Sequence, residues 1–577
     1  MSFFVLFKHD SPPETLDAFN RNAHRHHLEN RRSETVGAYR ICWYTDLRGE
    51  EPASYFAANG DFIIVHGTLI YRGEAAPACL PGLLNDFRVD SHDWGGMVGI
   101  HTVCICKAGR LYLFGDGLGA SKMYVNGNRT LWSNSFLAML EMRPSNRLDT
   151  QACYEYVING SVFGSRTLLE DVNTLPANAV LVVYQEVNRI DLASPIGNEP
   201  VGPEVPLDQI ADTCVHRLDR VFEPIARQFD ERLRLSFSGG FDSRLMLAML
   251  MKHGARPTLF VYGHANDEDV EIARLIARNE SLPLEHIDKS TAPAVSPEDF
   301  PKEMESNLFA FDGWKIESGL FDFGADRLDR LKRHAAGQVP LNGSLGEIYR
   351  NFFYMPDRPS STAAVVNTFY SRYDPRAFTE RFDESRYVAA MQAAMREAIG
   401  VDTDALDRSQ VEQLYPKFRG RFWTGRDAQL NQRFGPMFFP YLEHAAISNT
   451  SKIPIRYKDL GRLQGRMIAR VNARLAAYPS DYGFALDGPR PWKYRAKTLL
   501  STQRPSLARK YSFRLTHRTM QPRSGALAAG YLSRVIDATF PIMRSLFTID
   551  AVASAEQFGL IATLEYLAER YDLDIPD

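Results

Sequence analysis

Two different patterns of apolar and polar residues divide this chain. Up to about residue 190, short apolar runs alternate with turn residues, as at positions 62–65 and 111–114, and this pattern is typical of β-strands. From residue 207 onward, short apolar runs precede longer stretches with apolar residues three or four positions apart, which predicts strands followed by helices. A segment rich in Pro, Gly and Glu lies between the two, at 194–206. We expect a domain over 1–190, a second over 207–520, and a helical tail over 521–577.

One stretch of the second region combines a strand, a turn and a helix with chemistry-bearing residues. The apolar run 233–237 breaks at Gly239 and Gly240, and an apolar helical face resumes at Leu245. Glycines let the backbone turn its N–H groups toward a ligand, and the following helix directs its positive dipole end to the same point. Ser238 and Ser243 add hydroxyl groups. The stretch therefore predicts a pyrophosphate site, the alternative being an ordinary junction between strand and helix.

Asp242 is unexpected beside a phosphate unless a cation lies between them, as Mg²⁺ usually does. The stretch is not the other common phosphate loop, because no Gly-Lys-Ser/Thr follows it.

Composition narrows the class of protein. The 577 residues are 45% apolar and carry a net charge of −3, which suggests no general affinity for nucleic acid. No apolar run approaches the length of a membrane span, and the first ten residues lack the basic start of a signal peptide. Six scattered cysteines form no C-x-x-C pair. Buried free thiols in a reducing compartment explain them best, so we expect a cytoplasmic protein that acts away from membranes.

The Ser238–Ser243 stretch resembles the pyrophosphate loop of enzymes that split ATP into AMP and pyrophosphate, and among them the asparagine synthetase family. That resemblance implies an α/β multidomain fold. Its first domain would be an αββα glutaminase-like domain of the N-terminal-nucleophile type. Its second would be a doubly wound ATP-pyrophosphatase domain rich in helices.

The first region resembles the glutaminase domain of that family in the order of its weak motifs, such as 65–71, 95–99 and 113–124. Its chemistry departs from the family. Position 2 is Ser where the family has the nucleophilic Cys, and the Asn and Glu that grip glutamine are replaced by His66 and Thr68. A hydroxyl is a much poorer nucleophile than a thiolate at neutral pH. We therefore expect a structural domain, with an N-terminal hydrolase based on Ser2 as the alternative.

The second region offers further candidates in the order that the family has them. Val261 and Gly263 end the next apolar strand, where ligands bind in doubly wound sheets, and would meet the nucleoside. Residues 341–350 resemble the second phosphate loop of the family, with Gly343, Ser344 and Glu347 as site residues. The resemblance implies that Glu347 and Asp242 hold the metal. The Asp that precedes the Glu in the family is Gly346 here, and a surface turn is the alternative reading.

Two lysines are candidates for the charge that develops during ligation. Lys458 matches the position where the family presents a Lys four residues before an Arg, and Lys493 is the alternative. Residues 451–520 contain 16 Lys or Arg and only three Asp. This excess suggests an anionic substrate. A solvated helical face made by Arg462, Arg466, Arg470 and Arg474 explains it equally well.

The resemblance implies an ATP- and Mg²⁺-dependent ligase that activates a carboxylate as an acyl-adenylate and joins it to an amine. Without a glutaminase, the amine would be free ammonia or part of the substrate, which is a small molecule or a peptide. Family members of this kind include β-lactam synthetases and the macrolactam cyclases of lasso peptides, and a homodimer is possible. A degenerate member that binds nucleotide without turnover is the hypothesis of another class.

Overall fold

Two antiparallel sheets form the first part of the chain. The computed structural model describes residues 2–9, 13–46, 52–143, 146–200, 202, 204–288 and 295–576. One sheet has the strand order β13-β11-β12-β1-β3-β2 and the other β15-β14-β10-β9-β5-β4. The strands of the first are β1 (Ser2–Lys8), β2 (Leu28–Val36), β3 (Tyr39–Asp46), β11 (Tyr124–Asn126), β12 (Leu131–Ser133) and β13 (Val172–Thr174). Those of the second are β4 (Ala53–Phe56), β5 (Phe62–Gly67), β9 (His101–Lys107), β10 (Arg110–Gly115), β14 (Ala179–Val183) and β15 (Val187–Asp191).

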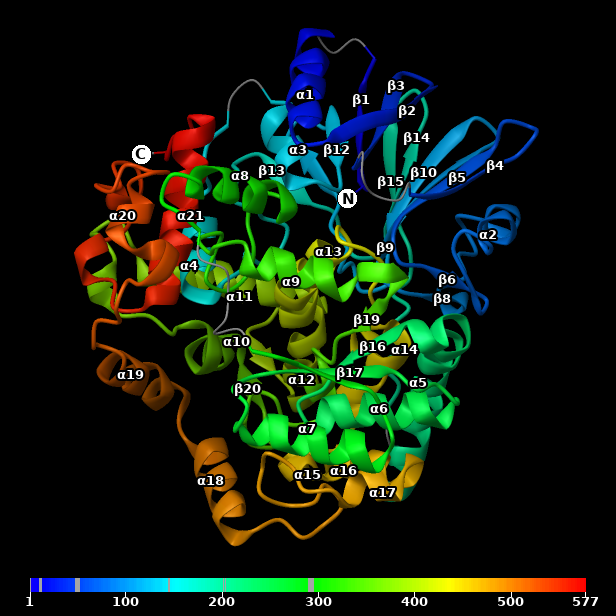
Figure 1. Cartoon of the computed structure of the whole chain (residues 1–577), viewed down its shortest axis with the longest axis vertical. Helices are drawn as coiled ribbons and strands as arrows, with labels where there is room; N and C mark the ends of the chain where they lie inside the picture. Colours follow the sequence, from blue (N-terminus) through cyan, green and yellow to red (C-terminus); the bar gives the residue numbers. More distant parts are fainter. Residues whose placement is uncertain are drawn as a thin grey trace.

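The alternation of side chains places one apolar core between the two sheets. Phe4, Leu6 and Trp43 from the first sheet pack with Cys104 and Leu113 from the second. Helix α2 (Leu80–Asp86) adds Leu80, Leu83 and Leu84 to a separate core that includes residues of β5 and β9. Helix α1 (Pro13–Arg25) and helix α3 (Phe136–Glu141) contribute to the core on the outer side of β1. The layers are therefore helix, sheet, sheet and helix (Figure 1).

A second sheet region holds the candidate phosphate loop. Four parallel strands have the order β18-β17-β16-β19, namely β16 (Leu233–Ser236), β17 (Thr258–Tyr262), β18 (Leu284–Ile287) and β19 (Val339–Leu341). Helices connect these strands, as they must between parallel neighbours: α6 (Phe241–Lys252), α7 (Glu268–Asn279), α8 (Phe300–Ala310) and α9 (Ala325–Arg333). The long helix α5 (Leu207–Phe229) precedes β16 and packs against α6.

Helices make up most of the remaining chain. The larger ones are α4 (Thr150–Asn159), α11 (Glu384–Ile399), α12 (Arg408–Leu414), α13 (Gly425–Asn431), α16 (Arg462–Val471) and α21 (Ala555–Tyr571). A ten-residue π-helix, η8 (Tyr415–Thr424), continues α12 without a break. No described helix has the length and apolar character needed to cross a bilayer. The molecule is a mixed α/β protein of several parts, as the sequence predicts.

Helix α21, within the predicted helical tail, lies against earlier parts of the chain. Helix α21 packs against α4 of the first part. The backbones of Arg147 and Asp574 form an isolated parallel β-bridge. The Thr563 hydroxyl accepts a hydrogen bond from the Leu320 N–H. Residues 555–574 therefore contact both of the preceding regions (Figure 1).

One buried aspartate ties the two sheet regions together. Asp312 accepts hydrogen bonds from the Ser135 hydroxyl at 2.5 Å and from the Phe136 N–H at 2.7 Å, at the start of α3. Its oxygens also lie 3.5 Å from the guanidinium groups of Arg426 and Arg433. Burial alone would raise the pKa of Asp312, but the two arginines and these hydrogen bonds lower it. The carboxylate therefore remains charged and joins α3 to α13 and its flanking loop.

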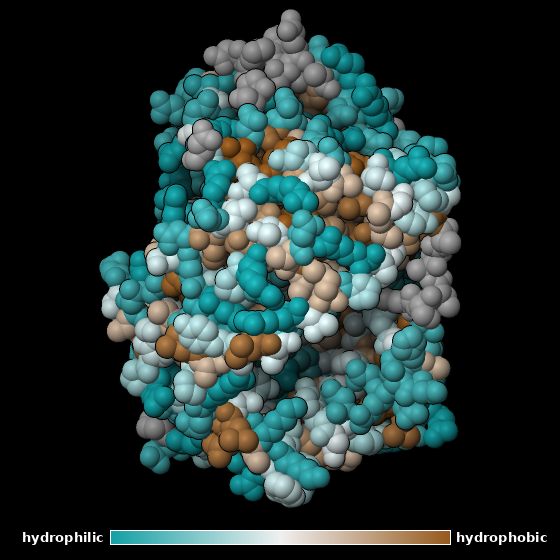
Figure 2. Space-filling model, turned by 90° about the vertical axis from the view of Figure 1, so that its left-hand side faces the viewer, coloured by the Kyte–Doolittle hydropathy of each residue, from teal (hydrophilic) through white to brown (hydrophobic). Residues whose placement is uncertain are grey.

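Two helices project from the body with apolar side chains in solvent. They are α18 (Trp492–Gln503) and α19 (Ser506–Thr516). Leu507, Tyr511 and Leu515 form one exposed face of α19, and Trp492 is 73% exposed. Figure 2 shows separate hydrophobic patches among hydrophilic ones on the lower half of the side of the molecule where these helices lie.

Candidate functional site

The turn after β16 leaves backbone donors open at the start of α6. Gly239 adopts a φ of +74°, and a Cβ there would lie 2.5 Å from Ile272 Cγ2, so only glycine fits. Gly240 is the N-cap of α6 and provides no side-chain cap for the first N–H groups. Ser238 is exposed, and its N–H donates to the Ser243 hydroxyl at 3.3 Å. The predicted loop thus has the geometry of an anion site at a helix N-terminus.

A buried arginine holds this turn in place. The Arg244 guanidinium is fully buried and donates to the carbonyls of Gly239, Tyr478 and Pro479. It therefore fixes the loop against the segment that follows α17 (Ala473–Ala477). Arg244 is not among the site residues that the sequence predicts. Its place four residues after the N-cap Gly240, one turn into α6, is the only signal in the sequence.

Asp242 lies in the first turn of α6 among polar partners. Its Oδ2 accepts from Arg350 Nη2 at 2.5 Å, and its Oδ1 accepts from Gln464 Nε2 at 2.7 Å. Burial, followed by the nearby Glu347 carboxylate, outweighs Arg350 and raises the pKa of Asp242 to about 7. Burial and Glu347 therefore favour the protonated form of Asp242 despite its ion pair with Arg350.

The second predicted loop lies directly on Asp242. A Cβ on Gly346 would lie 2.2 Å from Asp242 Oδ1, and a Cβ on Gly343 would lie 3.5 Å from Asp242 Cβ. Leu345 between them is buried and has a φ of +77°, a strained conformation for a branched side chain. Such strain persists only where the surroundings impose it, and it concentrates at functional sites. The substitution that the sequence flagged at position 346 is thus what allows the two loops to touch.

Glu347 follows at the start of a short helix, η5 (Gly346–Tyr349). Its Oε2 accepts from the Tyr415 hydroxyl at 2.7 Å, and its Oε1 lies 3.4 Å from Arg350 Nη2. The same Arg350 nitrogen therefore contacts both Asp242 and Glu347. The structure brings together the two residues that the sequence names as metal ligands. It adds Arg350 and Tyr415, for which the only hint is the spacing of Arg350 three residues after Glu347.

The remaining predicted ligand residues lie around these loops. Ser344 is half-buried, and its N–H donates to Asn342 Oδ1 at 2.8 Å. Val261 is buried near the end of β17, which pairs in parallel with β16. Gly263, with a φ of +141°, accepts a hydrogen bond from His286 Nε2 on its carbonyl. Val261 and Gly263 therefore lie at the carboxyl end of the strand beside the loop, as predicted.

Lys458 is buried in an ion pair instead of standing free. Its Nζ lies 2.5 Å from Glu412 Oε2, and Arg408 Nη1 binds Glu412 Oε1 at 2.7 Å. Burial outweighs Glu412 and lowers the pKa of Lys458. Glu412 and Tyr415 are three residues apart on the continuous helix α12–η8, so they share one face. The Lys458–Glu412 ion pair and the Tyr415–Glu347 hydrogen bond therefore involve neighbouring side chains of one helix. The alternative, Lys493, is exposed on α18.

The carboxylates of Asp242 and Glu347 are few in number for a metal site made of protein side chains alone. Among the residues that the structure describes, no three His, Cys, Asp or Glu side chains gather to hold a metal ion. Mg²⁺ needs no such set, because one or two carboxylates with phosphate oxygens and water complete its shell. Asp242 and Glu347 meet this requirement.

Part of the basic segment is neutralised by neighbouring acidic residues. Arg466 pairs with Asp208 and Arg470 with Asp212 on α5, and Arg474 Nε lies 3.0 Å from Glu280. Three of the four arginines on the helical face with four-residue spacing are therefore ion-paired, which is consistent with a solvated surface. It supplies no argument for an anionic substrate.

The first part contains a hydroxyl–imidazole contact. His66 Nδ1 lies 3.0 Å from Ser2 Oγ, and burial lowers the pKa of His66 to about 3, so the ring is neutral. His66 Nε2 is buried without a hydrogen-bond partner. A catalytic base is normally oriented by a third group through its other nitrogen. His66 has no such group among the described residues, which favours a structural role for this contact.

Comparison with known proteins adds little. No family model and no curated protein matches the chain. Among solved structures, a glutamine phosphoribosylpyrophosphate amidotransferase from B. subtilis, in complex with ADP and GMP, is similar at 9% identity and a TM-score of 0.21. The match covers 50% of this chain and 65% of that chain. Similarity at this level carries no argument about the fold or the activity of this protein.

Proposed function

We propose that this chain is an ATP-dependent ligase of the asparagine synthetase type that forms an amide and releases AMP and pyrophosphate. The observation that carries the proposal is the contact between the two loops. The Ser238–Ser243 turn opens backbone donors at the start of α6, and the second loop places Glu347 beside Asp242. Backbone donors next to paired carboxylates suit a metal-bound pyrophosphate leaving group.

The proposed reaction has two steps, adenylation of a carboxylate and attack by an amine. A carboxylate oxygen of the substrate attacks the α-phosphorus of ATP, and pyrophosphate leaves into the Ser238–Ser243 turn. The amine nitrogen then attacks the acyl carbon, loses a proton, and AMP leaves. Bound Mg²⁺ would be held by Asp242 and Glu347 and would neutralise charge on the phosphates. Lys458, oriented by Glu412, would stabilise the charge that develops in the second step.

The first part would be an αββα domain of the glutaminase type that has lost its activity. Its helix–sheet–sheet–helix layering supports this proposal, as does a Ser at position 2. The amine would then be free ammonia or part of the substrate. A lactam-forming or macrolactam-forming reaction would fit the second case. We further propose action in the cytoplasm on a small-molecule or peptide acid.

The test is the effect of Mg²⁺ on nucleotide binding. Titration of the full chain with the α,β-methylene analogue of ATP should show tighter binding when Mg²⁺ is present. Asp242→Asn and Glu347→Gln should each remove that Mg²⁺-dependent gain, and Asp208→Asn, a surface ion-pair variant, should retain it. Exchange of labelled pyrophosphate into ATP with a panel of carboxylic acids then tests adenylation. Absence of any binding of the analogue would overturn the proposal.

A second function is favoured by one observation. Both oxygens of Asp242 already accept hydrogen bonds, from Arg350 and Gln464. Arg350 could therefore replace the metal in a protein that binds nucleotide without turnover. This alternative predicts that the analogue binds equally well with and without Mg²⁺, and that no acid supports pyrophosphate exchange.

A further inference from the structure

A large cavity lies away from the two loops. Its volume is about 1000 Å³, which is the upper end of the range for small-molecule sites. One wall belongs to the first part, around β11, β15 and residues 173–178. The other wall is the C-terminal end of α11 together with η8. None of the residues 238–243 or 343–347 lines it, so the cavity is separate from the proposed nucleotide site.

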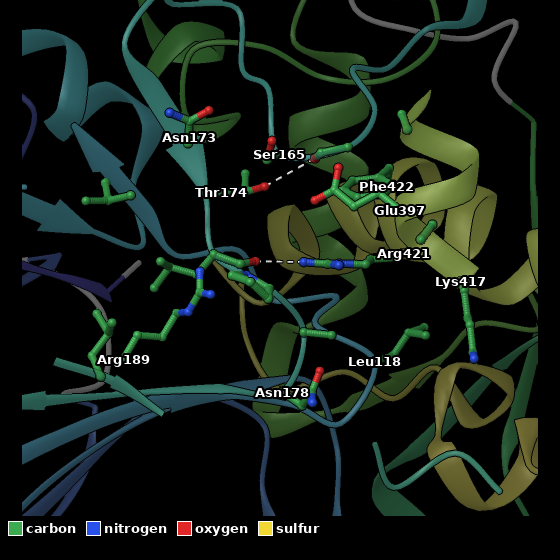
Figure 3. Close-up of a pocket in the computed structure, with 18 of the residues that line it drawn as sticks. Leu118, Ser165, Asn173, Thr174, Asn178, Arg189, Glu397, Lys417, Arg421 and Phe422 are labelled. Atoms are coloured by element: carbon green, nitrogen blue, oxygen red, sulfur yellow. Dashed lines mark hydrogen bonds between the residues drawn. The ribbon is translucent and has the colours of Figure 1, made fainter. Parts of the chain in front are cut away.

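The charges around this cavity are unbalanced. Arg129, Arg189, Lys417 and Arg421 line it, against Glu397 as the single acid. Figure 3 shows Lys417, Arg421 and Glu397 on one side of the cavity and Arg189 and Asn173 on the other. Arg189 pairs with Asp191 at 3.0 Å. Lys417 and Arg421 form no ion pair with any described residue.

The side chains of Lys417 and Arg421 each donate a hydrogen bond to an uncharged acceptor. Lys417 Nζ donates to Gln413 Oε1 at 3.0 Å. Arg421 Nη2 donates to the Leu175 carbonyl at 2.7 Å, and Figure 3 draws a dashed line at Arg421 for a hydrogen bond. Arg421 Nε is buried without a partner. Burial lowers the pKa of Lys417 and lowers that of Arg421 to about 10. The nearby carboxylates of Asp116 and Glu397 offset the effect of burial on the pKa of Arg421 only in part, and burial is the only influence on that of Lys417. Partly buried cations are costly when counter-charge is incomplete, and an anionic ligand would supply it.

We propose that this cavity binds a small molecule that carries a phosphate or carboxylate group, with Lys417 and Arg421 as its charged contacts. The guanidinium fork of Arg421 suits the paired oxygens of either group. Asn173, Thr174 and Asn188 on the facing wall offer hydrogen bonds to the polar remainder of the ligand.

The site also connects to the proposed nucleotide site through one element. Lys417 and Arg421 lie on η8, whose first residue, Tyr415, donates to Glu347. π-Helical turns are frequent at functional sites. A ligand that binds Lys417 and Arg421 would shift η8 and, through Tyr415, change the position of Glu347. This coupling rests on the proposed function, whereas the binding site does not.

The test uses citrate and inorganic phosphate as probes in calorimetric titrations of the full chain. At least one probe should bind, and Lys417→Gln should weaken that binding by tenfold or more, because a charge-assisted hydrogen bond is lost. Arg421→Gln should weaken it similarly. Arg189→Gln and Arg129→Gln, at exposed positions on the opposite wall, should fold normally and give smaller losses. Arg72→Gln, an exposed arginine of the first part outside the cavity, is the matched control.

Two results would overturn the inference. One is no heat of binding from either probe at millimolar concentration. The other is binding that all four cavity variants leave unchanged, because the anion would then lie elsewhere, for instance at the Ser238–Ser243 turn. The methylene analogue of ATP distinguishes the two sites. A protein that binds citrate but not the analogue would retain the cavity site and lose the ligase proposal.

Discussion

At the level of single residues, the proposed site depends on two glycines and one strained leucine. Gly343 and Gly346 allow the second loop to rest on Asp242, and Leu345 is held at positive φ between them. A side chain at position 346 would displace the carboxylate that we propose as a metal ligand. Glycine at position 346 is therefore required by the packing of the two loops.

Gly346→Ala tests this contact. The added methyl would overlap Asp242 Oδ1, and relief of such overpacking costs about 1–3 kcal/mol of stability. We expect the Mg²⁺-dependent gain in nucleotide affinity to disappear in the same variant. The control is Gly82→Ala in α2, where a Cβ meets nothing within 4 Å. It should raise the free energy of unfolding by about 0.5–1 kcal/mol. Unchanged nucleotide binding by Gly346→Ala would contradict the proposed role of the loop contact.

At the level of elements, the continuous helix α12–η8 organises the second part. It presents Glu412 to Lys458 and Tyr415 to Glu347, and two turns later Arg421 to the cavity. The i→i+5 spacing of η8 changes which faces its side chains occupy relative to an α-helix. One element therefore contributes to three polar sites.

Tyr415→Phe tests the link to Glu347. Removal of the hydroxyl leaves a carboxylate oxygen without its donor, and a hydrogen bond to a charged group contributes about 1.5–3 kcal/mol. We expect a loss of this order in urea unfolding, together with weaker binding of the ATP analogue. Tyr370→Phe is the matched control, because the buried Tyr370 hydroxyl has no hydrogen-bond partner. Equal effects of the two substitutions would show that the Tyr415 hydroxyl has no special role.

At the level of the whole molecule, buried carboxylates join the two sheet regions. Asp312 is kept charged by Arg426 and Arg433. Glu443 differs, because no cation among the described residues pairs with it, and its Oε1 accepts a hydrogen bond from the Gly99 N–H at 2.9 Å. Burial raises the pKa of Glu443 from 4.5 to about 8. Glu443 is therefore protonated at neutral pH in the folded protein, at the contact between residues 99 and 443.

This raised pKa makes stability depend on pH. Between pH 4.5 and about 8 the folded chain keeps a proton that the unfolded chain releases. Glu443 therefore lowers the free energy of unfolding by up to about 1.4 kcal/mol per pH unit as pH rises through that window. Glu443→Gln keeps the acceptor oxygen and abolishes the titration. Its stability relative to the parent should grow between pH 6 and pH 8 in urea unfolding, whereas exposed Glu231→Gln should show no trend. A constant difference would contradict the pKa assignment.

The sequence predicts the coarse architecture and the position of the phosphate turn because both are local. Alternating apolar residues mark the strands of the first part, and Gly239 and Gly240 mark the turn between β16 and α6. The sequence also names Asp242 and Glu347 as neighbours, although 105 positions separate them, because the family resemblance supplied that link.

What the sequence could not supply are contacts that depend on tertiary packing. Arg350 bridging the two carboxylates and Glu412 pairing with Lys458 need the arrangement of several helices. The ion pairs of the basic segment 451–520 could not be predicted from the sequence either. Its charge is visible in the sequence, but the aspartates that neutralise it lie on α5, more than 200 residues earlier.

The position of α21 has a consequence for how the protein is made. This helix leaves the ribosome almost 400 residues after α4, yet it packs against α4 of the first part. We expect the emerging chain to expose the apolar side of α4 until α21 has been synthesised. A stop codon shortly before residue 555 would then yield a chain that chaperones retain, even though both sheets and every proposed ligand residue are present.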